Sequence, residues 1–274
     1  MKNNIKKEAI VFFVLTLALS FLVFWGPIAL FKIPTVNLVD GPVGSIFAIV
    51  LFIIGGFVPS IAGIALTGYY EGKTGVRNLL KNSVRFGFSL KWYFIMLASA
   101  LFLAFGSILI YTTLGRNFDF SQFAVQLPTL LPLIILGPLS EEFGWRGFAL
   151  KRMLKLTNPN VASLIIGLVW SLWHLPLFFM IGTSQNEFGL PFIVFLISVT
   201  STSFAYTYFY IKTKGSLLSA IFLHWVFTFV MQVVASTVER TETYNWLEFM
   251  PALILGFIFS ILLNGYKNKK NANF

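Results

Sequence analysis

The chain is dominated by apolar blocks of about 20 residues, the length at which a helix crosses the roughly 30 Å hydrocarbon core of a bilayer. Strands of a membrane barrel would alternate apolar and polar residues over about 10 positions. Residues 46–54 and 253–263 do not alternate in this way. Hydrophobic residues make up 57% of the 274 residues and charged residues only 11%. Water-soluble domains typically contain fewer hydrophobic and more charged residues. The sequence therefore predicts an all-α membrane protein.

We predict a polytopic bundle of about eight transmembrane helices, with boundaries set by hydropathy. The spans are residues 9–31, 44–69, 92–113, 128–150, 161–181, 191–211, 217–236 and 246–266. No internal repeat or soluble insertion interrupts them, so residues 1–274 are expected to form a single membrane domain. Aromatic side chains of the kind that anchor helices at the membrane interface fall at span ends, namely Tyr69, Trp92, Trp246 and Tyr266.

Basic residues lie in alternate gaps between the spans. If the N-terminus is cytoplasmic, all of the 20 Lys and Arg residues are cytoplasmic except Lys32, Arg116 and Arg240. This asymmetry follows the positive-inside rule and predicts cytoplasmic N- and C-termini.

The same topology explains the net charge of +10. No nucleic-acid partner is expected, because the basic residues form no single basic face. The partner is the bilayer, and the usage of Lys, Asn, Ile and Phe is typical of a bacterial cell membrane protein from an AT-rich genome.

The segment of residues 72–91 has two interpretations. Leu79, Leu80 and Val84 alternate with Arg77 and Lys81, as in a basic amphipathic helix on the membrane surface. Alternatively, the segment is a loop that its charge keeps in the cytoplasm.

Few ionisable residues lie within the predicted spans. Such residues are costly in a membrane, which makes them candidates for function. Glu141, Glu142 and Arg146 end the fourth span, and the only two histidines of the chain, His174 and His224, lie in the fifth and seventh. Because the chain contains no cysteine, a metal would have to bind His, carboxylate or water.

Helix geometry distinguishes the two adjacent glutamates. Glu142 and Arg146 are four residues apart and share a face, so they are expected to form an ion pair. Glu141 points about 100° away from that face and is the candidate general base or metal ligand. A bend or a close approach of a neighbouring helix is expected from Pro138, Gly144 and Gly147.

Two chemical arrangements are open for Glu141 and the histidines. They can bind zinc as a His₂Glu set with one position free for water. Alternatively, Glu141 and His174 activate water directly, while His224 and Thr228, one helical turn apart, donate hydrogen bonds to the oxyanion. Trp170, four residues before His174, shares its face and can orient the imidazole.

Structural and transport roles are alternatives to hydrolysis. A histidine in a membrane helix can simply bond a neighbouring helix, and a Glu-Glu-Arg set at a helix end can anchor the interface. Buried Glu and His also form proton relays in transporters. Proton-coupled transporters, however, often have paired broken helices in two similar halves, which this sequence lacks.

Three motifs in order resemble those of the CPBP intramembrane proteases, also called the Abi or CAAX-protease family. Residues 141–147 resemble its Glu-Glu-x-x-x-Arg motif, and residues 170–174 its Phe-x-x-x-His motif, with Trp170 in place of Phe. Residues 214–224 resemble the lead-in to its His-x-x-x-Asn/Asp motif, but Thr228 replaces the final Asn or Asp. The resemblance covers roughly residues 130–230.

The resemblance implies an eight-helix endopeptidase with a cavity open toward the membrane. It implies that Glu141, His174 and His224 are essential and that the substrates are membrane-tethered peptides or proteins. In bacterial relatives it also implies roles in bacteriocin maturation or self-immunity. We therefore expect a glutamate- and histidine-dependent intramembrane peptidase, a metalloprotease if zinc is used. Glu142 and Arg146 would support the site, and a catalytically weak immunity or scaffolding protein is the alternative within the family.

Overall fold

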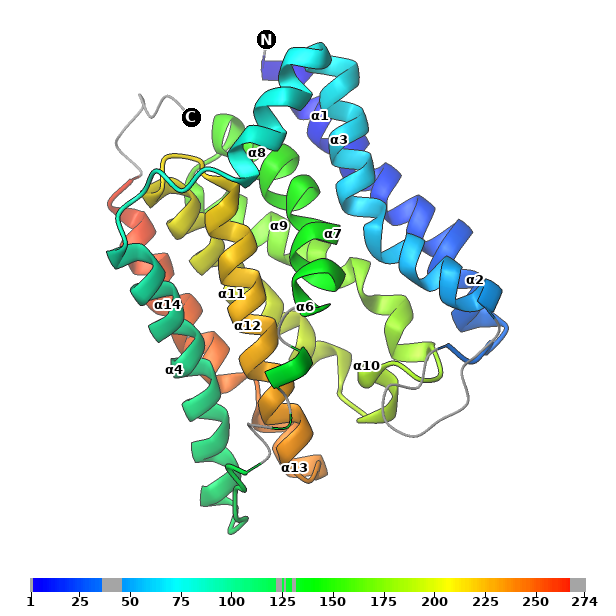
Figure 1. Ribbon diagram of the computed structural model, residues 1–274, viewed down its shortest axis with the longest axis vertical. Helices are drawn as coiled ribbons and strands as arrows, with labels where there is room; N and C mark the ends of the chain where they lie inside the picture. The colour runs from blue at the N-terminus through cyan, green and yellow to red at the C-terminus, as the bar shows by residue number, and fades with distance from the viewer. Residues whose placement is uncertain (1, 36–45, 122–124, 126, 130–131, 267–274) are drawn as a thin grey trace.

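The computed structural model describes residues 2–35, 46–121, 125, 127–129 and 132–266, and the regular structure of these residues is entirely helical (Figure 1). Seven helical stretches of the described chain are long and apolar enough to cross a membrane. They are Lys2–Leu30, Ile46–Ser83, Lys91–Thr113, Pro159–Phe179, Phe192–Lys212, Leu217–Thr237 and Glu242–Asn264. The prediction of an all-α polytopic membrane bundle is confirmed. Residue 44, the predicted start of the second span, and Lys267, Lys269 and Lys270 lie outside the described residues.

Local breaks divide these stretches into shorter helices. The first consists of α1 (Lys2–Ala18), a π-helical turn η1 (Leu19–Phe24) and α2 (Trp25–Leu30). Next come α3 (Ile46–Ser83), α4 (Lys91–Thr113) and a short 3₁₀ turn, η2 (Leu127–Thr129). The later elements are α9 (Pro159–Trp173), η5 (Leu175–Phe179), α10 (Ser184–Glu187), α11 (Phe192–Lys212), α12 (Leu217–Thr237), α13 (Glu242–Leu247) and α14 (Met250–Asn264).

The predicted fourth span is a helical run with π-helical turns. Its elements are α6 (Pro132–Ile134), η3 (Ile135–Leu139), α7 (Ser140–Glu142), η4 (Phe143–Leu150) and α8 (Lys151–Leu156). Pro138 has no N–H to donate within η3. Beside it, the Leu139 carbonyl accepts a hydrogen bond from the Ser60 hydroxyl of α3 at 2.9 Å. The run contacts α3 and α12 and stands at the centre of the bundle in Figure 1. It is more charged than the seven spans because it carries the Glu-Glu-Arg set.

Small residues let α3 approach this central run closely. A Cβ added to Gly63 would lie 2.6 Å from the Gly144 Cα, and one added to Gly144 would overlap the carbonyl group of Pro59. The expected close approach at Gly144 is confirmed. Gly147 similarly accommodates Leu79 from the far end of α3. Small residues also join the C-terminal helices, where Gly256 of α14 faces the backbone of α11.

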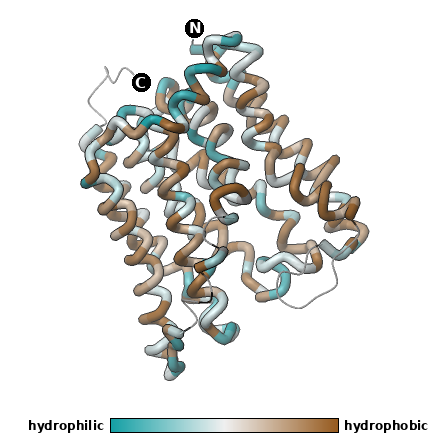
Figure 2. The backbone as a smooth tube through the Cα atoms, in the orientation of Figure 1, coloured by the Kyte–Doolittle hydropathy of each residue, from teal (hydrophilic) through white to brown (hydrophobic). Residues whose placement is uncertain are grey.

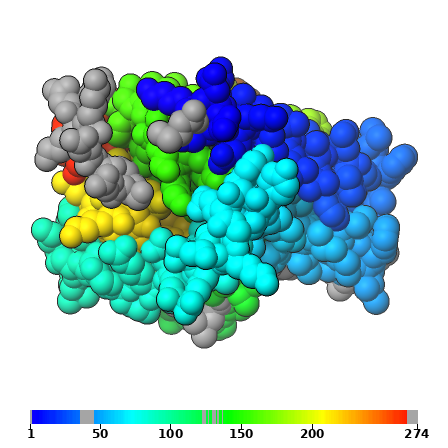
Figure 3. All heavy atoms as spheres, turned by 90° about the horizontal axis from the view of Figure 1, so that it is seen from above, coloured from blue at the N-terminus to red at the C-terminus, as the bar shows by residue number. Residues whose placement is uncertain are grey.

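One end of the bundle collects the charged residues, as the upper part of Figure 2 shows. Arg152 of α8 bonds Glu8 of α1 at 2.7 Å and Glu71 of α3 at 3.1 Å, and Lys151 also bonds Glu71 at 3.1 Å. Seen from this end, α1 and α3 (blue to cyan) lie side by side, and α4 lies beyond the cyan end of α3 (Figure 3). These contacts fasten the N-terminal helices to the central run.

The 72–91 segment is helical as far as Ser83. Gly72 turns the chain with a φ of 67°, a conformation that glycine adopts without steric penalty. Beyond it Leu79 is buried, whereas Leu80 is exposed. The first part of the segment therefore agrees with the helical interpretation rather than with the loop.

Candidate active site

Glu142 lies at the centre of a buried polar group that joins two helices. Its Oε1 accepts a hydrogen bond from Arg146 Nη1 at 2.8 Å, the ion pair expected from their spacing. The same oxygen accepts from His224 Nδ1 of α12 at 2.7 Å. Glu142 and Arg146 are fully buried and His224 is 7% exposed. Glu142 therefore orients the His224 ring, in addition to pairing with the arginine.

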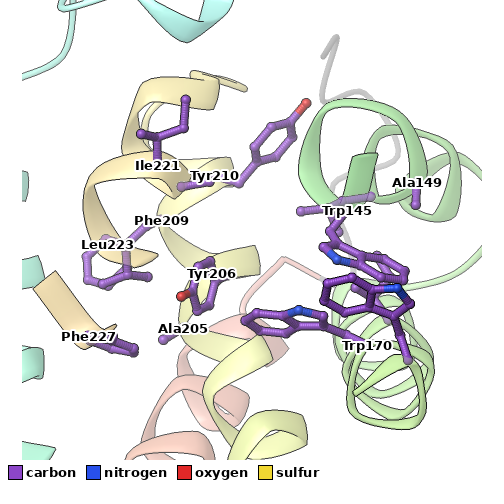
Figure 4. Close-up of a cluster of buried hydrophobic side chains, with 14 of the residues drawn as sticks. Trp145, Ala149, Trp170, Ala205, Tyr206, Phe209, Tyr210, Ile221, Leu223 and Phe227 are labelled. Atoms are coloured by element: carbon purple, nitrogen blue, oxygen red, sulfur yellow. The ribbon is translucent and has the colours of Figure 1, made fainter. Parts of the chain in front are cut away.

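Aromatic rings enclose the guanidinium of Arg146. Its Cζ lies 4.2 Å from the ring centre of Trp170 and 3.8 Å from that of Tyr206 on α11. Such cation–π contacts compensate in part for the water that a buried cation loses. Figure 4 shows Trp170 and Tyr206 in one aromatic cluster with Trp145. The cluster holds the arginine rigidly beside Glu142.

Glu141 faces away from the arginine, as its position on the helix predicts. Its Oε2 accepts a short hydrogen bond of 2.5 Å from the indole Nε1 of Trp170. The residue is 5% exposed, and its other oxygen, Oε1, has no hydrogen bond within the described part of the chain. One carboxylate oxygen is thus held in place while the other is left for water.

His174 stands where α9 ends. Pro176 cannot continue the α-helix, so the chain passes into the 3₁₀ turn η5 directly after the histidine. His174 Nδ1 donates to the backbone carbonyl of Trp170 at 2.8 Å. Trp170 thus orients the imidazole, as expected, but through its carbonyl oxygen. The fifth predicted span corresponds to Pro159–Phe179, in which α9 is followed by the 3₁₀ turn η5.

Both histidines have the same arrangement of ring nitrogens. Each donates through Nδ1, to a carbonyl or a carboxylate, and this assigns the proton to Nδ1. Nε2 of each ring has no hydrogen bond to any described residue, and is therefore left to accept a proton or to bind a ligand. In His224 this nitrogen faces the backbone of η3, since a Cβ on Gly137 would lie 3.1 Å from it.

Trp170 brings the candidate residues together. Its indole N–H bonds Glu141, and its ring centre lies 6.1 Å from that of His174 and 5.5 Å from that of His224. The carboxylate and the two imidazoles from three separate spans therefore surround one side chain. Thr228 lies one turn beyond His224 on α12 and is half-buried.

The expected zinc ligands do not form a metal-binding group. Among the described residues, no three His, Cys, Asp or Glu side chains have the geometry to hold an ion. Glu141, His174 and His224 each contact Trp170 instead, and one oxygen of Glu141 is already bonded to the indole. The donor set as arranged does not fit a three-ligand zinc site.

Sequence reasoning missed three features of the site. Gly137 and Tyr206 were not identified, because a glycine and a tyrosine in an apolar span carry no signal of their own. The bond between Glu142 and His224 joins residues 82 positions apart, so no local spacing could indicate it.

Two comparisons with known proteins agree with the motifs. A family model described as "Type II CAAX prenyl endopeptidase Rce1-like" matches residues 123–230, the part of the chain that carries every candidate residue. The chain is also 30% identical over 150 residues to "CAAX prenyl protease 2" of Methanococcus maripaludis. That match covers 52% of this chain and 53% of the relative, so the chain spans about half the length of the relative it matches. These matches and the three ordered motifs together support a member of the CPBP family.

Proposed function

We propose that the protein is an intramembrane endopeptidase that hydrolyses a peptide bond in a membrane-associated peptide or protein. The observation that carries this proposal is the gathering of Glu141, His174 and His224 around Trp170. The family description and the archaeal relative's name both specify a CAAX prenyl peptidase, which supports a membrane-tethered substrate. The chemistry proposed below uses side chains of this chain and water.

Glu141 acts as the general base in this proposal. Its free Oε1 takes a proton from a water molecule, while Nε2 of His174 accepts a hydrogen bond from the second hydrogen of that water. The water oxygen bonds to the carbonyl carbon of the substrate, and the carbonyl oxygen becomes an oxyanion. Glu141 then delivers its proton to the amide nitrogen, the C–N bond breaks, and a carboxylic acid and an amine leave. Positioned proton transfer of this kind typically contributes about 10²–10⁴-fold to rate.

His224 is proposed to stabilise the oxyanion. In its imidazolium form it has an Nε2–H to donate, while Nδ1 keeps its bond to the Glu142 carboxylate at 2.7 Å. The hydroxyl of Thr228 is the second donor in this scheme. A hydroxyl replaces the longer amide or carboxyl group that the family usually has here, so we expect a slower enzyme than relatives with Asn.

The proposal is tested by cleavage of a membrane-tethered reporter peptide in proteoliposomes. Glu141→Gln and His174→Ala are expected to lower the rate of cleavage by at least about 10²-fold. Glu242→Gln, which changes an exposed glutamate of α13, is the matched control and should cleave at the wild-type rate. A family member that serves in immunity or scaffolding would leave the reporter intact in every sample. A proton-coupled transporter would instead acidify liposomes without cleaving the peptide.

We further propose that the charged end of the bundle is cytoplasmic, with both termini on that side of a bacterial cell membrane. Most of the basic residues belong to this end, which supports the orientation. The absence of cysteine makes a direct test simple. Single cysteines at Lys81 and at Arg116, at opposite ends, should react with an impermeant maleimide from opposite sides of the membrane.

A further inference from the structure

An apolar groove opens on the lipid-facing side of α4, α11 and α14, lined by none of the candidate catalytic residues. Its volume is about 290 Å³, and its walls include Trp92 and Phe102 of α4, Tyr208 of α11, and Leu255 and Phe259 of α14. Figure 1 shows α4 and α14 side by side at one edge of the bundle, and the two helices are in contact. A groove between them therefore faces the acyl chains of the bilayer.

The groove begins where the two outer helices separate. Near its closed end α4 and α14 touch, since a Cβ on Gly106 would lie 2.7 Å from Pro251. Phe102 and Leu255, each one helical turn from this contact, are the first groove residues on their helices. From there the groove continues to Trp92, toward the charged end of the bundle.

The length of the groove matches one leaflet of the membrane. Trp92 and Phe102 are ten residues apart on α4, which corresponds to about 15 Å at the rise of an α-helix. The hydrocarbon core of a bilayer is about 30 Å thick, so the groove has the reach of one acyl chain from the interface to the midplane. A chain lying in it would contact aromatic and aliphatic side chains throughout.

Two lysines stand at the open, interfacial end. Lys91 Nζ lies 5.1 Å from the ring centre of Trp92. Lys212 Nζ lies 5.3 Å from that of Tyr208 and 5.1 Å from that of Tyr266. None of the ion pairs within the described residues involves either lysine. Two positive charges without a carboxylate partner among the described residues thus lie at the open end of the apolar groove.

We propose that this groove is a binding site for an anionic phospholipid from the leaflet at the charged end of the bundle. The acyl chain would lie along Trp92 and Phe102, and the phosphate would contact Lys91 and Lys212. The uncompensated lysine charges select an anionic headgroup over a zwitterionic one, and they disfavour an apolar helix from a second copy of the chain. The proposal is independent of peptidase activity.

The test uses phospholipids with brominated acyl chains, which quench tryptophan fluorescence on contact. The full-length protein is reconstituted with brominated phosphatidylglycerol or brominated phosphatidylcholine diluted in unlabelled phosphatidylcholine. The contribution of Trp92 to the quenched fluorescence is the difference between the wild-type protein and Trp92→Phe. Each lysine near the membrane surface is expected to favour the anionic lipid about fivefold, the equivalent of about 1 kcal/mol.

Three variants separate the headgroup contacts from the groove. Lys212→Gln and Lys91→Gln should each reduce the preference for phosphatidylglycerol about fivefold. Ala98→Phe, at an exposed groove residue, should reduce quenching of Trp92 by both lipids without altering either lysine. Lys81→Gln, an exposed lysine of α3 away from the groove, is the matched control and should change nothing.

Two results would overturn the site. One is equal quenching of Trp92 by the two lipids in the wild-type protein. In that case the lipid beside Trp92 would be bulk lipid of the surrounding bilayer, bound without headgroup preference. The other is a preference that persists when both lysines are replaced. If a lysine variant fails to fold, Ala98→Phe still decides whether an acyl chain occupies the groove. Cross-linking between copies through Ala98→Cys would show instead that a second chain covers this face.

Discussion

The indole N–H of Trp170 donates a hydrogen bond to Oε2 of Glu141, at 2.5 Å. The CPBP motif usually has phenylalanine at this position, and phenylalanine has no donor. In this chain the tryptophan therefore holds the carboxylate directly while also touching both imidazoles. Trp170→Phe keeps an aromatic ring but loses the bond, and we expect cleavage of the reporter to slow about tenfold, in line with hydrogen bonds to charged groups of about 1.5–3 kcal/mol.

Trp25→Phe is the control for that substitution. Trp25 is also buried and donates its indole N–H, but to the backbone carbonyl of Phe52 at 2.9 Å, outside the site. Its replacement should lower the melting temperature without a selective loss of activity. Equal rates for Trp170→Phe and the wild type would show that the bond to Glu141 does not position the base.

The pairing of Glu142 with Arg146 is predicted to be essential for stability. Arg146→Met leaves a fully buried carboxylate with only the His224 ring as partner, which should destabilise the protein by about 3–5 kcal/mol. Glu142→Gln added to Arg146→Met removes the unpaired charge and should restore much of the melting temperature in detergent. The double variant should remain inactive, because it lacks the carboxylate that holds Nδ1 of His224.

An exposed ion pair supplies the control. Arg116 and Glu239 bond at 2.7 Å, but their side chains are 43% and 71% exposed. Arg116→Met should therefore change stability by no more than about 1 kcal/mol. A double variant no more stable than Arg146→Met alone would contradict the buried-charge explanation.

The close packing of Gly137 against His224 leads to a separate prediction about activity. A Cβ on Gly137 would lie 3.1 Å from His224 Nε2, so Gly137→Ala should push the imidazole away by a few tenths of an ångström. We expect cleavage to fall about tenfold, since displacements of about 1 Å can cost 10²-fold. Gly68→Ala, whose new Cβ would meet only a Val76 methyl group at 3.5 Å, should retain full activity.

The contact between α3 and the central run is predicted to limit stability. A Cβ on Gly144 would overlap the backbone of Pro59, and neither helix backbone can move aside easily. Gly144→Ala should therefore destabilise the protein by about 1–3 kcal/mol or more, measured as a lower melting temperature. Gly56→Ala is the control, since its Cβ would meet Trp25 at 3.8 Å. Equal melting temperatures for the two variants would refute the close contact.

Metal analysis tests the arrangement of the donors. Because the described residues contain no three-ligand group, we expect purified protein to carry no stoichiometric zinc and to keep its activity in EDTA. Zinc bound at one ion per chain in the wild type and lost in Glu141→Ala would show that the donors rearrange around a metal.

Hydropathy alone predicted most of the fold, because the length and polarity of a membrane span leave few alternatives. The eight predicted segments correspond to the seven apolar helical stretches and the charged central run. The breaks within helices were harder to predict. The π-helical turns of η3 and η4 lie against α3, with contacts such as the Ser60 bond to Leu139 that no local pattern reveals.

The contacts among the candidate site residues were predictable only in part. The four-residue spacing of Glu142 and Arg146 predicted their ion pair, and the position of Glu141 predicted its separate face. The partnership of Glu142 with His224 depends on how two distant helices dock. The indole of Trp170 was expected to orient His174, whereas it bonds Glu141 and leaves its carbonyl to hold the histidine.

The pairing of Glu142 and Arg146 within one helical run has a consequence for biosynthesis. His224 is made 82 residues after Glu142, which at 5–20 residues per second is a delay of about 4–16 seconds. During that delay the central run must enter the bilayer without the histidine. Because the glutamate and the arginine neutralise each other one turn apart, the nascent segment can be inserted before the translating ribosome has supplied the histidine.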